Sequence, residues 1–164
     1  MVIVCVIGCG ILGSRIAGEL SMCGHKVRVW DRDNTKLDSL PHQLEYDREV
    51  AAINGLLMCK VLGDVSIFND MSEAVKGASI VIEAIAEDLK VKSELMKKIS
   101  AVVAEKVIIA TSTLRLPLET IFEDVPHPER CIGVRFLFPV YSISEVEMSS
   151  YDMTDKVRID RMSS

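Results

Sequence analysis

The sequence lacks the features that would place it in several large classes of protein. No apolar stretch approaches the roughly 18 uninterrupted residues that a membrane-spanning helix needs. Lysines and arginines do not cluster, and the formal net charge is −5, so we expect no nucleic-acid partner. No internal repeat or low-complexity tract interrupts the chain. With 49% apolar and 26% charged residues among 164, the composition is typical of one globular domain.

Metal-binding and disulfide patterns are also missing. The five cysteines are odd in number, follow no metal-ligand spacing and mostly lie in apolar runs. We therefore predict reduced thiols, no metal site and a cytoplasmic protein. Cys9 lies near a predicted helix N-terminus, which can lower the pKa of a thiol. Its position in the surrounding glycine motif tolerates any residue, so we expect no redox role for it.

The first 31 residues contain a glycine-rich turn in a strand–turn–helix–strand context. Val2–Ile7 is an apolar run without a basic segment before it, so it predicts a core strand rather than a secretion signal. It leads directly into GCGILG at residues 8–13. Ser14–Cys23 has apolar residues at helical spacing, and Lys26–Trp30 predicts a second strand that ends at Asp31. This arrangement is typical of dinucleotide-binding sites.

Each residue type in this motif has a physical reason. Gly8 permits a tight turn, Gly10 leaves room for a pyrophosphate, and Gly13 lets the helix pack close to the strand. Asp31 can accept hydrogen bonds from both ribose hydroxyls and would repel a 2′-phosphate, which favours NAD over NADP. Arg32 weakens that preference. The alternative is a glycine turn that joins a strand to a helix and binds nothing.

Helices and strands alternate along the rest of the chain. Most strands are apolar throughout, which predicts an α/β fold of the Rossmann type, a doubly wound, mostly parallel sheet with helices on both faces. We expect helices over 33–40, 43–62, 71–76, 88–104 and 117–122, with an interruption at Pro41 and a stop at Gly63. We expect strands over 65–68, 79–84, 107–111, 131–136 and 146–148.

Ligands of such sheets bind beyond the carboxyl ends of the strands, so the residues that follow each strand are the candidate site. These are Gly8, Gly10, Ile11, Leu12 and Gly13 in the first turn, Asp31 and Arg32 after the second strand, Ala84, Ile85, Glu87 and Lys92 after 79–84, Ser112–Leu114, and Arg135–Phe138.

Three stretches together resemble the NAD-binding domain of the L-3-hydroxyacyl-CoA dehydrogenases, a family that includes lambda-crystallin. They are VIGCGILGSRIAGEL at 6–20, KGASIVIEAIAEDLKVKSELMKKI at 76–99 and PERCIGVRFLFPV at 128–140. The second stretch is the most specific. The resemblance implies that the glycines and Asp31 hold the adenosine half of NAD, with Glu87 and Lys92 near the nicotinamide ribose. The alternative for Glu87 and Lys92 is a solvated helix start, where Glu87 and Asp88 favour the helix dipole.

The resemblance fails at the residues that would carry out proton transfer. Where the family has a catalytic histidine and an asparagine, this chain has Arg135 and Phe138, and where the family has a substrate-contacting serine it has Leu114. The glutamate that orients the histidine is retained as Glu147, 12 residues after Arg135. Arginine stays charged and cannot act as a base. We therefore predict an ion pair between Arg135 and Glu147.

The family also has a helical second domain, which supplies much of the acyl-CoA site and the dimer contact. We expect 1–150 to form the NAD-binding domain, 151–164 to be a polar and partly disordered tail, and the helical domain to be absent. Its absence would leave apolar surface open to a protein partner.

Three hypotheses follow. The first is an NAD-binding module that has lost acid–base catalysis. The second is an active oxidoreductase with an altered substrate, for which acyl-CoA or a small hydroxy acid is the candidate. In this hypothesis Arg135 binds an anionic group of the substrate, and Lys92 or Glu87 transfers the proton. The third is an interaction protein that keeps only the fold, with a filled or collapsed glycine turn.

Overall fold

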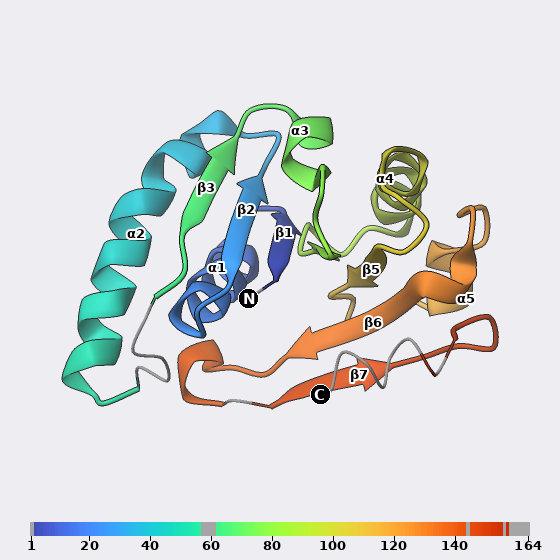
Figure 1. Cartoon of the computed structure of the whole chain (residues 1–164). Coiled ribbons are helices and arrows are strands. Elements are labelled where there is room, and N and C mark those ends of the chain that lie inside the picture. Colours follow the sequence, from blue (N-terminus) through green and yellow to red (C-terminus); the bar gives the residue numbers. More distant parts are fainter. Residues whose placement is uncertain (1, 57–61, 144, 156, 158–164) are drawn as a thin grey trace.

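A computed structural model describes residues 2–56, 62–143, 145–155 and 157. One seven-stranded sheet runs through the molecule in the order β3-β2-β1-β4-β5-β6-β7, with helices against it (Figure 1). The strands are β1 (Ile3–Ile7), β2 (Lys26–Trp30), β3 (Val65–Phe68), β4 (Ile80–Glu83), β5 (Ile108–Thr111), β6 (Cys131–Phe136) and β7 (Val146–Ser149). The helices are α1 (Ile11–Met22), α2 (Asn34–Ile53), α3 (Met71–Val75), α4 (Leu89–Val102) and α5 (Leu118–Ile121), with 3₁₀ turns η1 (Pro128–Arg130) and η2 (Val140–Ser142).

Strand pairing confirms the predicted doubly wound fold. Every neighbouring pair is parallel except β6 and β7, which are antiparallel. The chain moves from β1 outward to β2 and β3, and then returns to place β4 on the other side of β1. The strand order therefore reverses between β1 and β4, which leaves a crevice at their carboxyl ends where ligands bind in this fold.

Two hydrophobic cores cover the two faces of the sheet. On one face, alternate residues of β1 and β2 pack with α1 and α2, among them Val6, Val29, Ile16 and Leu40. On the other face, Ile7 and Ile109 pack with α3, α4 and α5. The central strands are apolar on both sides because both sides are buried, which is why the sequence shows runs rather than alternation.

Local side-chain caps fix the start of three helices. Asp33, Asp70 and Asp88 each accept a hydrogen bond from a backbone N–H in the first turn of α2, α3 and α4. An aspartate directly before each of these helices is thus the local signal that sets its start. Helix α1 begins at Ile11, three residues before the expected start, since its first turn belongs to the glycine motif itself.

The expected break at Pro41 is wrong. Helix α2 runs from Asn34 to Ile53 with Pro41 inside it. Leu37, Leu40 and Leu44 are all buried in the core on the same helix face, so tertiary packing holds the helix together across the residue that would otherwise end it. The helix then ends at Ile53, followed by Gly55 at φ 68°, rather than at Gly63. The part of the expected helix at 57–61 lies outside the described residues.

Packing continues past the expected domain boundary at residue 150. Tyr151 stacks on Phe122 with ring centroids 5.8 Å apart. The Thr154 hydroxyl donates to the carbonyl oxygen of Cys131 at 2.9 Å, and the Asp155 N–H donates to that of Glu129 at 2.8 Å. Residues 151–155 are thus part of the packed domain. The expectation of disorder for 156 and 158–164 falls outside the described residues. No helix in the described part of the chain is long and apolar enough to cross a membrane.

Candidate functional site

The glycine turn after β1 is shaped by backbone contacts that exclude side chains. Gly8 adopts φ 105°, and a Cβ there would lie 2.7 Å from the carbonyl oxygen of Ala84. A Cβ on Gly13 would overlap the carbonyl oxygen of Gly8, so the close approach of α1 to the turn requires glycine. Gly10 differs, because a Cβ there would meet nothing within 4 Å. The open side of the turn therefore lies over Gly10, as expected for a pyrophosphate position.

A cleft of about 590 Å³ begins at this open side and lies between the ends of β1, β2 and β4 and helix α4. Six of the predicted site residues line it, namely Gly8, Gly10, Asp31, Arg32, Ala84 and Ile85. Trp30 and Leu95 contribute apolar walls. Among the predicted residues of the first turn, Ile11 is largely exposed and Leu12 packs against the core.

Asp31 lies at the end of β2 with its carboxylate turned toward the protein. Its Oδ2 atom accepts from the N–H of Cys9 at 2.6 Å, and Oδ1 accepts from the N–H of Asp33 at 2.9 Å. The ammonium of Lys36 is 3.9 Å from Oδ2. A carboxylate has about four lone-pair positions, so these contacts leave acceptor capacity for a ribose hydroxyl.

Lys92 is fully buried and belongs to a charged network beneath the cleft. Its ammonium is 2.7 Å from Oε1 of Glu83 and 3.6 Å from Oε2 of Glu87. Both Lys92 and Glu83 have 0% exposed side chains. The Thr111 hydroxyl donates to the other Glu83 oxygen at 2.6 Å, and the Ile85 N–H donates to Oε1 at 2.7 Å. The alternative of a solvated helix start is therefore wrong for Lys92.

Glu83 is a residue that the sequence analysis missed. It is the last residue of the apolar strand β4, where it was counted as part of a buried strand. Two signals could have found it: a carboxylate that ends an apolar run, and a lysine nine residues later in the first turn of a helix. Because a buried charge needs a partner, these two signals together would have predicted an ion pair between Glu83 and Lys92.

Glu87 connects the loop after β4 to the loop after β5. Its Oε1 atom accepts from the Thr113 hydroxyl at 2.7 Å and from the N–H groups of Leu114 and Arg115 at 2.8 and 3.0 Å. Partial burial opposes the charge on Glu87, but these hydrogen bonds and Lys92 outweigh it and lower the pKa of Glu87 below its usual value. Ser112, also a predicted site residue, is buried between the two loops, with its N–H bonded to the Glu83 carbonyl oxygen at 2.9 Å.

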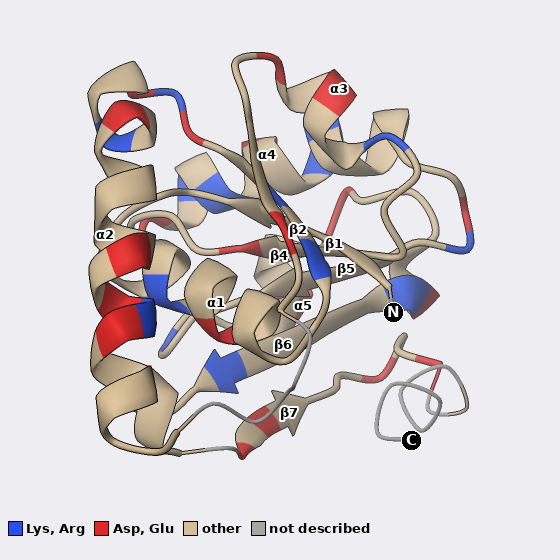
Figure 2. Cartoon of the chain, turned by 60° about the vertical axis from the view of Figure 1, so that its left-hand side comes forward, with Lys and Arg blue, Asp and Glu red and all other residues tan. Residues whose placement is uncertain are grey.

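The ends of β6 and β7 carry the predicted ion pair. Arg135 and Glu147 are directly opposite each other in the antiparallel ladder, and their side chains form a salt bridge. Figure 2 shows the basic end of β6 alongside β7, which carries an acidic position. Leu114 and Phe138 are mostly exposed, at 62% and 58%. Neither side chain carries a hydroxyl or an amide, so neither side chain can hydrogen-bond a carbonyl group.

The pKa of the Cys9 thiol is raised, whereas a helix N-terminus would lower it. Burial, with a further contribution from the charge of Asp31, raises the pKa of Cys9 to about 11. The thiol is therefore protonated at neutral pH and a poor nucleophile.

A second cluster that the sequence did not reveal ties the segment after β6 to α1 and α2. Asp47, buried on α2, accepts from the Tyr141 hydroxyl at 2.7 Å and from Gln43 at 2.9 Å, and it forms a salt bridge with Arg15. The guanidinium of Arg15 lies over the Tyr141 ring, 5.4 Å from its centroid. Asp47 and Tyr141 are 94 residues apart, so no local pattern could have predicted the contact.

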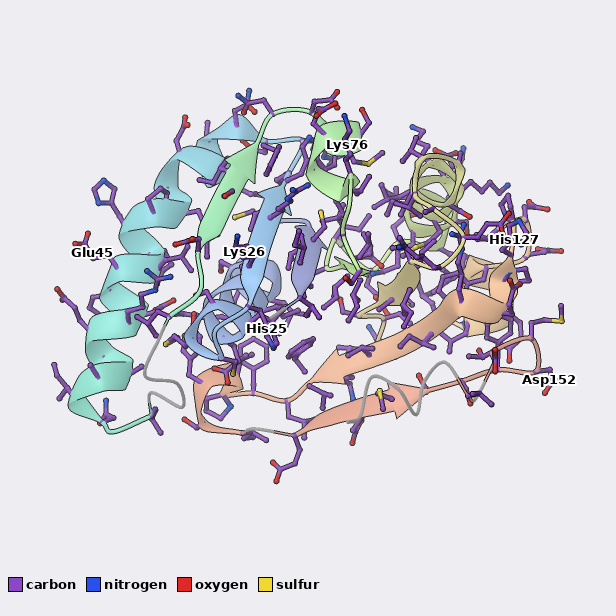
Figure 3. The ribbon with its side chains drawn as sticks, viewed as in Figure 1. His25, Lys26, Glu45, Lys76, His127 and Asp152 are labelled. Carbon is purple, nitrogen blue, oxygen red and sulfur yellow. The ribbon has the colours of Figure 1, made fainter. Side chains whose placement is uncertain are left out.

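Another hollow, of about 720 Å³, lies away from the candidate site. It is lined mainly by apolar side chains of β1, β4, β5, β6 and β7, together with His25 and Lys106. His25 and Lys26 stand at the amino end of β2, and Figure 3 shows where they lie. The cleft at the carboxyl ends of β1, β2 and β4 is instead the one that brings together Gly8, Asp31 and Ala84 of the predicted site.

Comparison with known proteins agrees with this geometry. The family described as "3-hydroxyacyl-CoA dehydrogenase, NAD binding domain" matches residues 3–164. The chain belongs to this family. It is an NAD-binding domain, and its glycine turn, its inward acid and its open cleft fit the dinucleotide.

Curated members of the family are similar over nearly the whole chain. A 3-hydroxybutyryl-CoA dehydrogenase from Clostridioides difficile is 30% identical over 94% of this chain and 56% of its own length. The mitochondrial hydroxyacyl-coenzyme A dehydrogenase of Sus scrofa is 30% identical over 97% of this chain and 54% of its own. The chain thus spans about half the length of these relatives.

Solved structures share the fold. A dehydrogenase of 5-formyl-3-hydroxy-2-methylpyridine 4-carboxylic acid, described as an NAD⁺-dependent dismutase, superposes with a TM-score of 0.90 at 23% identity, over 99% of this chain and 53% of that one. A 3-hydroxybutyryl-CoA dehydrogenase from Escherichia coli K12 superposes with a TM-score of 0.88 at 24% identity, over 99% of this chain and 35% of that one.

Proposed function

We propose that this domain of the 3-hydroxyacyl-CoA dehydrogenase family binds NAD or NADH without the histidine-based proton transfer of its relatives. The proposal rests on a contrast between two parts of the same edge of the sheet, the dinucleotide turn and the position of the catalytic base. The glycine turn and Asp31 are arranged for a dinucleotide. The position of the base is taken by Arg135, which is paired with Glu147.

The residues of the cleft have distinct roles in this proposal. The free N–H groups at the start of α1 bind the pyrophosphate, and Gly10 leaves the space that the phosphates need. Asp31 accepts from the adenosine ribose. Glu87 and Lys92 fix the loops after β4 and β5, which border the nicotinamide end. When bound, the nicotinamide supplies hydride chemistry; the chain supplies position and charge.

Alcohol oxidation by hydride transfer also needs a base for the hydroxyl proton, with a pKa near the working pH. Arg135 stays protonated, and Leu114 and Phe138 offer no polar group to a substrate carbonyl. Loss of a general base typically slows a reaction by about 10²–10⁴-fold. We expect turnover of 3-hydroxyacyl-CoA substrates to be slower than that of a histidine-containing relative by at least this factor.

An altered oxidoreductase is the second candidate, because the Arg135 guanidinium is partly exposed and could meet an anionic substrate group. Two contacts argue against it. Glu147 already balances the charge of Arg135, and Lys92 is fully buried against Glu83, where it cannot reach a substrate proton. A role as an interaction protein that keeps only the fold predicts a filled glycine turn, whereas the space over Gly10 is open.

Two measurements test the proposal. Titration calorimetry should detect binding of NAD and NADH, and no binding at millimolar concentration would contradict it. Absorbance of NADH should then be followed with 3-hydroxybutyryl-CoA and with a panel of small hydroxy acids. Rapid NADH formation from any of these substrates would instead support the altered oxidoreductase, and the variant Arg135→Ala would show whether Arg135 binds that substrate.

A further inference from the structure

On the α1 side of the sheet, the face of strands β4 to β7 is only partly covered by the described residues. Helices α1 and α2 pack over β1 and β2 on this side, whereas α3, α4 and α5 pack on the opposite side. The hollow of about 720 Å³ lies over this face, and Leu20 of α1 is the one described helix residue that lines it. Ligand pockets usually measure about 300–1,000 Å³, so the hollow has the size of a small-molecule site.

Most of the hollow is apolar. The residues at its floor are buried and aliphatic, namely Val4, Ile82, Ala110 and Val134. At the β7 side, Val146 and Met148 keep 42% and 39% of their surface exposed. Because apolar side chains in contact with water favour a ligand that covers them with apolar surface of its own, this part of the hollow fits a hydrocarbon group.

The polar groups of the hollow gather at its other end. Its described lining residues include three polar ones, His25, Ser79 and Lys106, and each lies one or two residues before a strand. Strands β2, β4 and β5 all belong to the parallel part of the sheet, so their amino ends lie along the same edge. No aspartate or glutamate is among the described lining residues. This end therefore offers an ammonium, an imidazole and a hydroxyl to an anionic group.

The imidazole of His25 lacks a protein partner for one of its nitrogens. Its Nδ1 atom is buried and has no hydrogen bond with any described residue, and Figure 3 shows the ring beside the amino end of β2. A buried polar atom without a partner costs free energy, so this atom calls for a partner that the described chain does not supply. Lys106 is exposed, so its ammonium is free to turn toward a group bound at this end.

We propose that this hollow binds a carboxylate with a straight alkyl chain, that is, a free medium-chain fatty acid. The carboxylate lies beside Lys106 and His25, and the alkyl chain crosses the apolar face toward Val146 and Met148. Charge complementarity selects the anionic head group, and the aliphatic walls select the chain. The hollow shares no described lining residue with the dinucleotide cleft, so the proposal does not depend on cofactor binding.

Titration calorimetry with octanoate, decanoate and dodecanoate, each kept below the concentration at which it forms micelles, tests the proposal. Burial of one methylene group is worth about a fourfold gain in affinity, so the dissociation constant should fall by about tenfold for each pair of added carbons until the hollow is filled. Decylammonium, which has the same chain and the opposite charge, should bind at least about tenfold more weakly than decanoate. Failure of all three carboxylates to bind at millimolar concentration would overturn the proposal, and so would equal binding of decylammonium and decanoate.

Variants at the two ends of the hollow show where the ligand lies. Lys106→Met should weaken decanoate binding by about three- to fivefold and leave NAD affinity unchanged. Lys90→Met is the matched control, because it removes the same charge from α4 on the opposite side of the sheet, and it should leave decanoate affinity unchanged. Equal losses in these two variants would mean non-specific attraction and would overturn the assignment of the carboxylate to Lys106.

Met148→Gln changes the apolar end, and it should weaken dodecanoate binding more than octanoate binding. Equal effects on the two ligands would contradict the proposed direction of the alkyl chain. Lys106, Lys90 and Met148 are all exposed, so thermal unfolding of their variants should match the wild type.

A protein that covers the same face would give a different set of results. Light scattering detects a second copy of the chain, and titration with a model amphipathic helix of leucine and glutamate detects affinity for an acidic helix. A dimer that dissociates in Met148→Gln, or binding of the model helix, in either case without binding of decanoate, would overturn the fatty-acid site in favour of a protein-docking surface.

Discussion

At the carboxyl ends of β1, β2 and β4 the backbone itself forms the site, whereas at the ends of β5 and β6 particular side chains would have to form it. The first region keeps Gly8, Gly10 and Gly13 in a turn that only glycine fits at two of its positions. The second region presents exposed Leu114 and Phe138 beside an arginine–glutamate pair. A binding site made by backbone geometry persists as long as the fold does, while proton transfer depends on one group with a suitable pKa.

The glycine turn should give the largest effects, and two of its glycines should separate folding from binding. Gly13→Ala places a Cβ on the carbonyl oxygen of Gly8, so we expect a loss of about 4 kcal/mol or more in the free energy of unfolding. Gly10→Ala should unfold within about 0.5–1 kcal/mol of the wild type, since its Cβ meets open space and φ is −77°. Urea denaturation measures both.

The Gly10→Ala variant, which should barely change stability, should strongly weaken NAD binding. The Gly10→Ala methyl group occupies the space for the pyrophosphate, so NAD affinity should fall by at least about tenfold in a folded protein. If Gly10→Ala binds NAD as tightly as the wild type, the backbone turn is not the phosphate site and the contrast between the two regions fails.

The buried pair of Lys92 and Glu83 should give the next largest effect. Lys92→Met leaves the Glu83 carboxylate buried without its cation, at an expected cost of about 3 kcal/mol in unfolding free energy. The double variant Lys92→Met, Glu83→Gln removes the uncompensated charge, so it should be more stable than the single variant. A double variant that is no more stable than Lys92→Met would show that the loss comes from packing rather than from charge.

Glu87 offers a smaller effect with a defined pH dependence. Its folded pKa lies below the usual 4.5, so its stabilising contribution is present above about pH 4.5 and is lost as the pH falls through the folded pKa. Glu87→Gln should therefore cost about 1 kcal/mol at pH 7 and less at pH 3.5, measured by urea denaturation at both pH values. Glu94→Gln is the control, since that exposed glutamate lines the same cleft, and it should change stability little at either pH.

The Arg135–Glu147 pair should matter least for stability and for cofactor binding. Both side chains are partly exposed, so Arg135→Ala should lower the unfolding free energy by less than about 1 kcal/mol. NAD affinity should stay within about twofold of the wild type, because the pair lies in the region that we assign no cofactor role. A large loss of NAD affinity in Arg135→Ala would mean that the two regions are not independent.

Much of the fold could be predicted from local patterns. The glycine motif and the apolar runs of β1, β4 and β5 are local signals, and the structure confirms the turn and the strands that they predict. The ion pair of Arg135 and Glu147 was predicted too, because a family resemblance placed the two positions together. Local signals failed at Pro41, where buried leucines of α2 outweigh the proline, and at Gly55, which follows the end of the helix.

The amino-acid sequence by itself determined the alternation of strands and helices, the glycine turn and the identity of the residues on which the proposed loss of proton transfer rests. These features depend on residue type and on short spacings along the chain. Only the tertiary structure decided that Lys92 is buried against Glu83, that Asp31 is turned inward beside Lys36, and that Asp47 holds Tyr141. Burial and charge balance depend on which neighbours the fold brings together, and those neighbours come from distant parts of the chain.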